Sequence, residues 1–281
     1  MMNHEEQYEE ERHEPHRSSI IREEARGQFL FKWFRIDVNG REPIPGLLVH
    51  KPVNPHNKSL LFVHGFGGSK EDVVNFGEVA ETLGFSMLAI DARGHGDRKP
   101  AFIGAPAQEL LGFLGGSIVD NRIAIDMASR NGWVEEGKLI LVGTSMGGIL
   151  GGVIAGVDQR ISGAALYVAG GDLVEILKSG KHPVVSQVVS GIPGFMFSLF
   201  KGQVGNIDPI NYIDRISPRP LLLQLGKNDD YVPFDCGMKL FDRAKEPKDL
   251  VVHDSGHDLP REKVLSETIN WIRKRFPDLV E

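Results

Sequence analysis

The stretch Gly143-Thr144-Ser145-Met146-Gly147 constrains the fold more than any other part of the chain. It follows the apolar residues 139–142 and opens a glycine-rich segment with helical character. A strand that turns at once into a helix strains the backbone at the corner, and glycines on either side let neighbouring elements approach closely. The pattern therefore predicts a serine hydroxyl at the tip of a sheet, beside the N-terminus of a helix.

Strand and helix patterns alternate through most of the chain. Apolar runs that predict strands lie at 59–63, 85–90, 138–142, 161–168, 221–225 and 250–252. Helical patterns lie at 69–83, 121–130, 145–156, 235–245 and 260–275. This alternation implies right-handed crossovers and a mostly parallel sheet with helices on both faces. A turn at Asn39-Gly40 between the runs 29–36 and 46–50 predicts an antiparallel hairpin at one edge, for about eight strands in all.

The N-terminal residues 1–26 lie outside this alternation. They are dense in Glu, His and Arg, and such a stretch buries too little apolar surface to offset its ordering entropy. We expect a flexible charged tail or a weak charged helix here, followed by one domain over 27–281. His4, His13 and His16 are irregularly spaced in this tail, so we expect them to be solvated rather than to bind a metal.

A second region outside the alternation is the stretch 170–215, between two predicted strands. Insertions of this length in a compact domain are usually functional or disordered, and this one is too apolar to be disordered. We interpret it as a helical lid, with Phe195 and Phe200 on the substrate side. An ordinary packing excursion or a subunit interface is the alternative.

Composition excludes several classes of function. The 281 residues carry a net charge of −6 with no basic concentration, so we expect no nucleic-acid partner. The single cysteine, Cys236, cannot form an intrachain disulfide. Runs of about 18 apolar residues and a secretory signal are both lacking, so we expect no stable membrane insertion and a cytoplasmic location. The sequence implies no metal and no cofactor, and leaves a homo-oligomer open.

Serine is a weak nucleophile unless a base and an acid lie nearby. His257 follows the last predicted strand, where catalytic groups collect in open α/β sheets. His253 is the competing base, but it falls at the strand end, where packing is the simpler role. Asp229 and Asp230 follow the strand 221–225, and either could orient the histidine on chemical grounds alone.

An acyl-transfer site also needs donors for the oxyanion. The backbone N–H of Met146 is one candidate, because it opens the helix after Ser145 and the helix dipole favours negative charge there. The second candidate is the N–H of Phe66 in His64-Gly65-Phe66-Gly67-Gly68, whose glycines let the backbone approach a substrate.

These motifs in this order resemble the α/β-hydrolase family from about residue 28 to 277. The matching stretches are His64-Gly65, Asp91-Ala92-Arg93-Gly94-His95-Gly96, Gly143 to Gly147, Gly226-x-x-Asp229-x-x-Val232-Pro233 and Ser255-Gly256-His257. Within the family the chain looks like esterases and peptidases related to dienelactone hydrolase and prolyl oligopeptidase. The resemblance implies an α/β-hydrolase fold and selects Asp229 over Asp230 as the acid. Gly143-Thr144 departs from the Gly-His of many relatives, and the lid region has no motif that aligns.

Three polar residues near the predicted strand ends are further candidates for substrate contact, namely His64, Arg93 and His95. The alternative for Arg93 and His95 is a structural turn, or a brace for the oxyanion loop.

We therefore predict a serine hydrolase that cleaves small-molecule esters of small or medium acyl groups through an acyl-enzyme, with Ser145, His257 and Asp229 as its triad. A peptidase or an acyltransferase of the same fold is the rival enzyme. A non-catalytic binding scaffold is the rival outside enzymes, although such proteins commonly lose a triad member and none is missing here.

Overall fold

The structure is a computed structural model that describes residues 3–52, 58–98, 107–183, 185–186, 202 and 204–280. The strands are β1 (Arg17–Arg26), β2 (Phe29–Asp37), β3 (Ile44–His50), β4 (Ser59–Val63), β5 (Ser86–Ile90), β6 (Leu139–Thr144), β7 (Ile161–Tyr167), β8 (Leu221–Gly226) and β9 (Lys248–His253). The helices are α1 (His4–Glu11), α2 (Gly77–Leu83), α3 (Ala107–Arg130), α4 (Met146–Val157), α5 (Leu173–Ser179), α8 (Phe234–Arg243) and α9 (Arg261–Arg275). Short 3-10 helices are η1 (Lys70–Phe76), η2 (Pro209–Asn211), η3 (Ile213–Arg215) and η4 (Pro277–Leu279).

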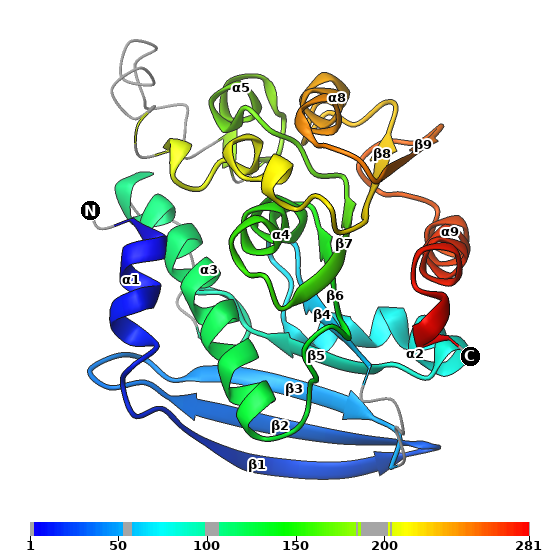
Figure 1. Cartoon of the computed structure of the whole chain (residues 1–281). Helices are drawn as coiled ribbons and strands as arrows, with labels where there is room; N and C mark the ends of the chain where they lie inside the picture. The colour runs from blue at the N-terminus through cyan, green and yellow to red at the C-terminus, as the bar shows by residue number, and fades with distance from the viewer. Residues whose placement is uncertain are drawn as a thin grey trace.

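Within these described residues the strands form one sheet of nine, in the order β1-β2-β3-β5-β4-β6-β7-β8-β9. Along this spatial order, the neighbours β1-β2, β2-β3 and β3-β5 are antiparallel, and all pairs from β5-β4 onward to β8-β9 are parallel. The predicted hairpin is the pair β2 and β3, in which Phe31 lies opposite Val49. Because β4, β6, β7, β8 and β9 run in one direction, their carboxyl ends meet at one edge of the sheet (Figure 1).

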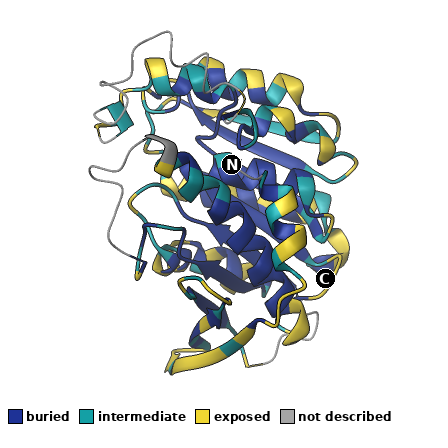
Figure 2. Ribbon diagram, turned by 90° about the vertical axis from the view of Figure 1, so that its left-hand side faces the viewer, coloured by how far each residue is buried: buried dark blue, intermediate teal, exposed yellow. Residues whose placement is uncertain are grey.

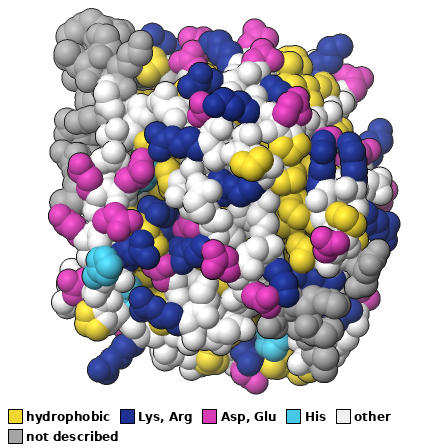
Figure 3. Space-filling view, in the orientation of Figure 1, with side chains coloured by type: hydrophobic (Ala, Val, Ile, Leu, Met, Phe, Trp, Pro, Cys, Tyr) yellow, Lys and Arg dark blue, Asp and Glu magenta, His cyan; other side chains and the backbone are white. Residues whose placement is uncertain are grey.

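Helices cover both faces of this sheet, as the sequence predicts. One core contains side chains of α1, α3, α4, α5 and α8, and the other contains side chains of η1, α2 and α9. The central strands are buried throughout, as continuously apolar strands in a parallel sheet should be (Figure 2). On the surface that Figure 3 shows, Lys and Arg side chains are interspersed with Asp and Glu.

Of the two alternatives for the N-terminal segment, a flexible tail or a charged helix, the structure shows a helix at its start, followed by a strand. Residues 4–11 form α1, which packs on α3. Residues 17–26 form β1 at the edge of the sheet, which brings the number of strands from the expected eight to nine. The Tyr8 side chain is 1% exposed, and its hydroxyl donates to Asp126 at 2.9 Å. The Arg122 guanidinium lies over the Tyr8 ring, 3.4 Å from its centroid. The expected domain boundary at residue 27 is therefore wrong, because these partners from α3 order a segment whose own composition is polar.

Two of the three tail histidines are also buried, against expectation. His4 is 3% exposed, and its Nε2 lies 3.2 Å from the Tyr212 hydroxyl. His16 is buried, with its Nε2 2.8 Å from the carbonyl oxygen of Glu11. Burial lowers the pKa of His4 to about 4. His13 is exposed, as predicted.

The predicted helices are present with changed limits. The segment 69–83 begins with a capping box at Ser69 and ends at the left-handed Gly84, but its first half is the 3-10 helix η1. The helix expected at 121–130 begins at residue 107. Of the expected lid 170–215, the structure describes α5 and the chain through residue 183, with parts of 185–215. Phe195 and Phe200 lie outside the described residues, so the lid stays a prediction.

Candidate active site

Ser145 lies at the corner between β6 and α4. Its backbone has φ 54° and ψ −122°, a conformation that costs free energy for a residue with a side chain. Its N–H donates to the carbonyl of Tyr167 at 2.9 Å, which ties the corner to β7. A Cβ on Gly147 would overlap the Val63 carbonyl, and one on Gly143 would overlap the backbone of Gly147. Both glycines are needed because three pieces of backbone meet at this turn.

His257 and Asp229 reach the corner from the neighbouring strand ends. His257 follows β9, and its Nε2 lies 2.8 Å from Ser145 Oγ. Its Nδ1 lies 2.8 Å and 3.0 Å from the two carboxylate oxygens of Asp229, which follows β8. The Asp229 side chain is almost completely buried, and its Oδ1 accepts from the backbone N–H groups of Tyr231 and Val232. An ionised Asp229 held in this way can fix the imidazole with Nδ1 protonated and Nε2 facing the hydroxyl.

The competing residues lie elsewhere. His253 is buried at the end of β9, where its Nε2 lies 2.8 Å from Oε1 of Gln224. Asp230 is exposed and forms an ion pair with Lys181 at 3.2 Å. The structure therefore brings His257 and Asp229 to Ser145, and leaves His253 and Asp230 in contacts of their own.

The loop after β4 packs against the serine corner. A Cβ on Gly65 would lie 3.3 Å from the Thr144 carbonyl and 3.5 Å from Ser145 Cβ, so the two backbones are in contact. The Gly68 N–H closes this loop by donating to Gly65 at 3.1 Å. Met146 opens α4 directly after the serine. Both residues predicted to supply oxyanion donors, Phe66 and Met146, thus belong to backbone segments that adjoin Ser145.

His64 and His95 brace this loop. The Nε2 of His64 accepts from the Ala92 N–H at 3.0 Å, so Nδ1 carries the proton and donates to the Gly65 carbonyl at 2.8 Å. The Nδ1 of His95 lies 3.1 Å from the Arg93 carbonyl, and its ring packs edge-on against Phe66. Burial lowers the pKa of both histidines, that of His95 to about 4. These contacts favour the bracing role over substrate contact.

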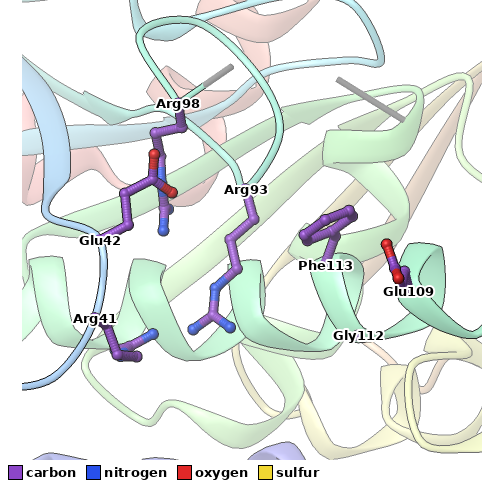
Figure 4. A pocket seen from close by; sticks show the side chains of 7 residues that line it. All are labelled: Arg41, Glu42, Arg93, Arg98, Glu109, Gly112 and Phe113. Atoms are coloured by element: carbon purple, nitrogen blue, oxygen red, sulfur yellow. The ribbon is translucent and has the colours of Figure 1, made fainter. Parts of the chain in front are cut away.

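The Arg93 side chain contacts α3. Its guanidinium donates to both carboxylate oxygens of Asp120, at 2.9 Å and 3.0 Å. Arg41 and Arg98 donate to the same fully buried carboxylate, and the three cations hold its pKa well below the usual range. An adjoining pocket of about 520 Å³ is lined by Arg41, Glu42, Arg93, Arg98, Glu109, Gly112 and Phe113 (Figure 4). None of Ser145, His257 and Asp229 lines this pocket, and the contacts of Arg93 with α3 favour a structural role over substrate contact.

Two side chains beside the site did not emerge from sequence reasoning, Tyr231 and His182. The Tyr231 ring lies 4.9 Å from the His257 ring, and the His182 ring lies 5.0 Å from that of Tyr231. Tyr231 stands two residues after Asp229 in the acid loop, so its position in the motif could have singled it out. His182 belongs to the region without any aligned motif, and its sequence neighbours carry no signal for it.

In the part of the chain that the structure describes, no group of three or more His, Cys, Asp or Glu side chains could hold a metal ion. Across the same residues, every helix is too short or too polar to cross a membrane.

The architecture is a doubly wound α/β sheet with a hydrogen-bonded Ser-His-Asp group at the carboxyl ends of its strands. A sequence model of the alpha/beta hydrolase family matches residues 60–214, and the chain belongs to this family.

Two relatives and one solved structure show which proteins the chain resembles. The chain is 26% identical over 244 residues to the putative esterase YitV of Bacillus subtilis, covering 81% of this chain and 94% of YitV. It is 28% identical over 203 residues to YfhR of Escherichia coli K12, covering 72% of this chain and 63% of YfhR. An acetyl xylan esterase from Paenibacillus sp. R4 shares the fold, with a TM-score of 0.76 at 19% identity over 95% of this chain and 92% of that one.

Proposed function

We propose that this protein is a serine hydrolase that cleaves carboxylic esters of small or medium acyl groups through an acyl-enzyme. The observation that carries the proposal is the unbroken hydrogen-bonded series from Ser145 Oγ through His257 to Asp229, built on a strained strand-to-helix corner. Strain of this kind persists where the surrounding structure maintains it, and it clusters at active sites. Relatives such as the putative esterase YitV support ester substrates.

In the first half of the reaction, His257 Nε2 accepts the proton of Ser145 Oγ while that oxygen attacks the acyl carbon. The N–H groups of Met146 and Phe66 hold the resulting oxyanion. His257 then donates its proton to the leaving alcohol oxygen, and the acyl group stays on Ser145. Asp229 remains ionised throughout and stabilises the imidazolium.

In the second half, His257 accepts a proton from water as the water oxygen attacks the acyl carbon. The carbon–Oγ bond breaks, Ser145 recovers its proton from His257, and the acid is released. The proton of Ser145 leaves with the alcohol and a proton from water replaces it, so the enzyme returns to its starting state and the reaction needs no external cofactor.

The test compares the wild-type protein with Ser145→Ala, using a fluorophosphonate probe and 4-nitrophenyl acetate. We expect the wild type to be labelled and to hydrolyse the ester, and Ser145→Ala to lose labelling and about 10⁴-fold or more of kcat. Ser179→Ala, which changes an exposed serine on α5, is the matched control and should behave as wild type. Absence of labelling in folded wild-type protein would instead favour a binding scaffold.

A second arm separates the rival enzymes. The anilide with the same acyl group should be turned over far more slowly than the ester, and added methanol should not exceed water as acceptor. Faster cleavage of the anilide would indicate a peptidase, and dominant transfer to methanol would indicate an acyltransferase.

A further inference from the structure

Four aromatic rings form a continuous row beside Ser145. Starting at the loop after β4, the ring centroids of Phe66 and His182 are 5.1 Å apart, those of His182 and Tyr231 are 5.0 Å apart, and those of Tyr231 and His257 are 4.9 Å apart. The first two pairs are edge-to-face, an arrangement that aromatic groups favour. The row therefore joins the loop after β4 to the loops after β8 and β9.

Sheet order places this row across the site. The strands β6 and β7 lie between β4 and β8, so a row from the β4 loop to the β8 loop must pass over the carboxyl ends of β6 and β7. Ser145 is at the carboxyl end of β6, with its N–H bonded to the last residue of β7. Phe66, Tyr231 and His257 belong to the loops after β4, β8 and β9. His182 follows α5 instead.

The segment that carries His182 is fixed to the acid loop. A Cβ on Gly180 would overlap the Tyr231 carbonyl, so the two backbones touch. The Lys181 N–H donates to the Asp230 carbonyl at 2.6 Å. Beyond the ring, the Ser186 N–H donates to the His182 carbonyl at 2.8 Å. The contacts just before His182 therefore attach it to the acid loop, and the turn after it is closed by its own carbonyl.

The His182 ring is suited to apolar packing. Burial and the neighbouring His257 lower its pKa, so the ring is neutral near pH 7. It packs directly on Phe66, the residue proposed to hold the acyl oxygen, and lies one ring farther from His257 than Tyr231 does. Because His257 delivers the proton to the leaving alcohol and the Tyr231 ring lies between the rings of His257 and His182, we infer that the acyl group extends toward the His182 ring.

We propose that His182 is a specificity-determining residue whose ring limits the length of the acyl chain that can be bound beside Ser145, so that the natural substrates are short-acyl esters. This inference rests on the proposed function and names its substrate class. A fixed wall rejects a longer chain because the extra methylenes must either displace packed rings or stay in water. Pockets of this kind discriminate by about 10-fold or more per methylene.

The experiment measures kcat/KM for 4-nitrophenyl acetate, butyrate and hexanoate with the wild type, His182→Ala, His182→Phe and Lys181→Ala. We expect His182→Ala to raise the hexanoate-to-acetate ratio by about 10-fold, mainly through the hexanoate value. His182→Phe restores a ring and should keep the wild-type ratio. Lys181→Ala removes the exposed neighbouring ion pair and should also keep it.

A second series keeps the acetyl group and lengthens the alcohol, and here His182→Ala should leave the preference unchanged. Fluorophosphonate labelling of each variant checks that the site is intact. An unchanged acyl-length profile in labelled His182→Ala, or a change with the alcohol alone, overturns the role of His182 while the serine mechanism stands. Failure of the wild type to be labelled and to hydrolyse any ester would instead remove the proposed function itself.

Discussion

The serine corner and the N-terminal segment are ordered by opposite means. At the corner, backbone contacts close to Ser145 determine the conformation, since Gly143 and Gly147 leave no room for a side chain. In the N-terminal segment, the ordering contacts come from far along the chain, such as the Tyr8 hydroxyl on Asp126, 118 residues away. The sequence signal for the first region therefore lies in five consecutive residues, whereas the second region carries no such local signal and depends on distant partners in the folded chain.

This difference separates two kinds of mutational effect. Changes at the acid loop should alter catalysis with little effect on folding, because the Asp229 carboxylate acts on His257. Changes in the N-terminal segment should alter stability with little effect on the rate per folded molecule, because α1 packs on α3 and contributes no residue to the site. The three predictions below test this separation, in order of expected effect.

The largest effect is expected from Asp229→Asn. Asparagine can offer its amide to Nδ1 and favour the wrong imidazole tautomer, so we expect kcat for 4-nitrophenyl acetate to fall by about 10³- to 10⁴-fold with little change in Tm. Asp230→Asn is the matched control, because this exposed neighbour forms a surface ion pair with Lys181, and its kcat should stay within about twofold. Equal losses in the two variants would contradict the assignment of the acid.

The same contrast, between contacts that are near in the chain and contacts that are distant, explains how much of the structure can be predicted from the sequence. The central strands, the limits of the helical segment 69–83 and the serine corner follow from neighbouring residues, and each is found where the pattern places it. The β1 strand does not, because both of its faces are largely polar and exposed, and its Arg22 packs on Trp33 of β2 through a cation–π contact.

Two features of the site lie beyond such local signals. Arg93 stands in a motif at the catalytic edge, yet the buried carboxylate of Asp120, 27 residues away, turns it toward α3. His182 is placed by the contact of Gly180 with the acid loop, which no periodicity in the sequence encodes.

The second prediction concerns Tyr8, the fully buried anchor of α1. Tyr8→Ala removes its ring from beneath the Arg122 guanidinium and takes one donor from Asp126, which keeps its ion pair with Arg160, so we expect a loss of about 3–5 kcal/mol in the free energy of unfolding. Tyr8→Phe keeps the ring and should cost about 1–2 kcal/mol. Urea unfolding gives both values. At temperatures where the variants remain folded, kcat should match the wild type, and a large fall in kcat would show that the segment also shapes the site.

The third and smallest effect is the pH dependence contributed by His4. Its pKa is lowered to about 4 in the folded protein, chiefly by burial, and returns to about 6.5 in the unfolded chain. The unfolded state therefore binds the proton more readily between these values. The stabilisation from a neutral His4 is complete above about pH 6.5 and is lost as the pH falls toward 4, for at most about 3 kcal/mol.

The measurement compares urea unfolding from pH 7 to pH 4.5 in the wild type, His4→Gln and His13→Gln. Glutamine cannot take up the proton but can still face the Tyr212 hydroxyl, so His4→Gln should lose less stability over this range than the wild type. His13 is exposed in the same segment, and His13→Gln should follow the wild-type curve because this side chain lies in water in the folded as in the unfolded chain. Buried histidines elsewhere, such as His95, affect all three proteins equally and cancel in the comparison. If His4→Gln kept the full wild-type slope, His4 would be titrating in water, and the burial of α1 against the domain would have to be abandoned.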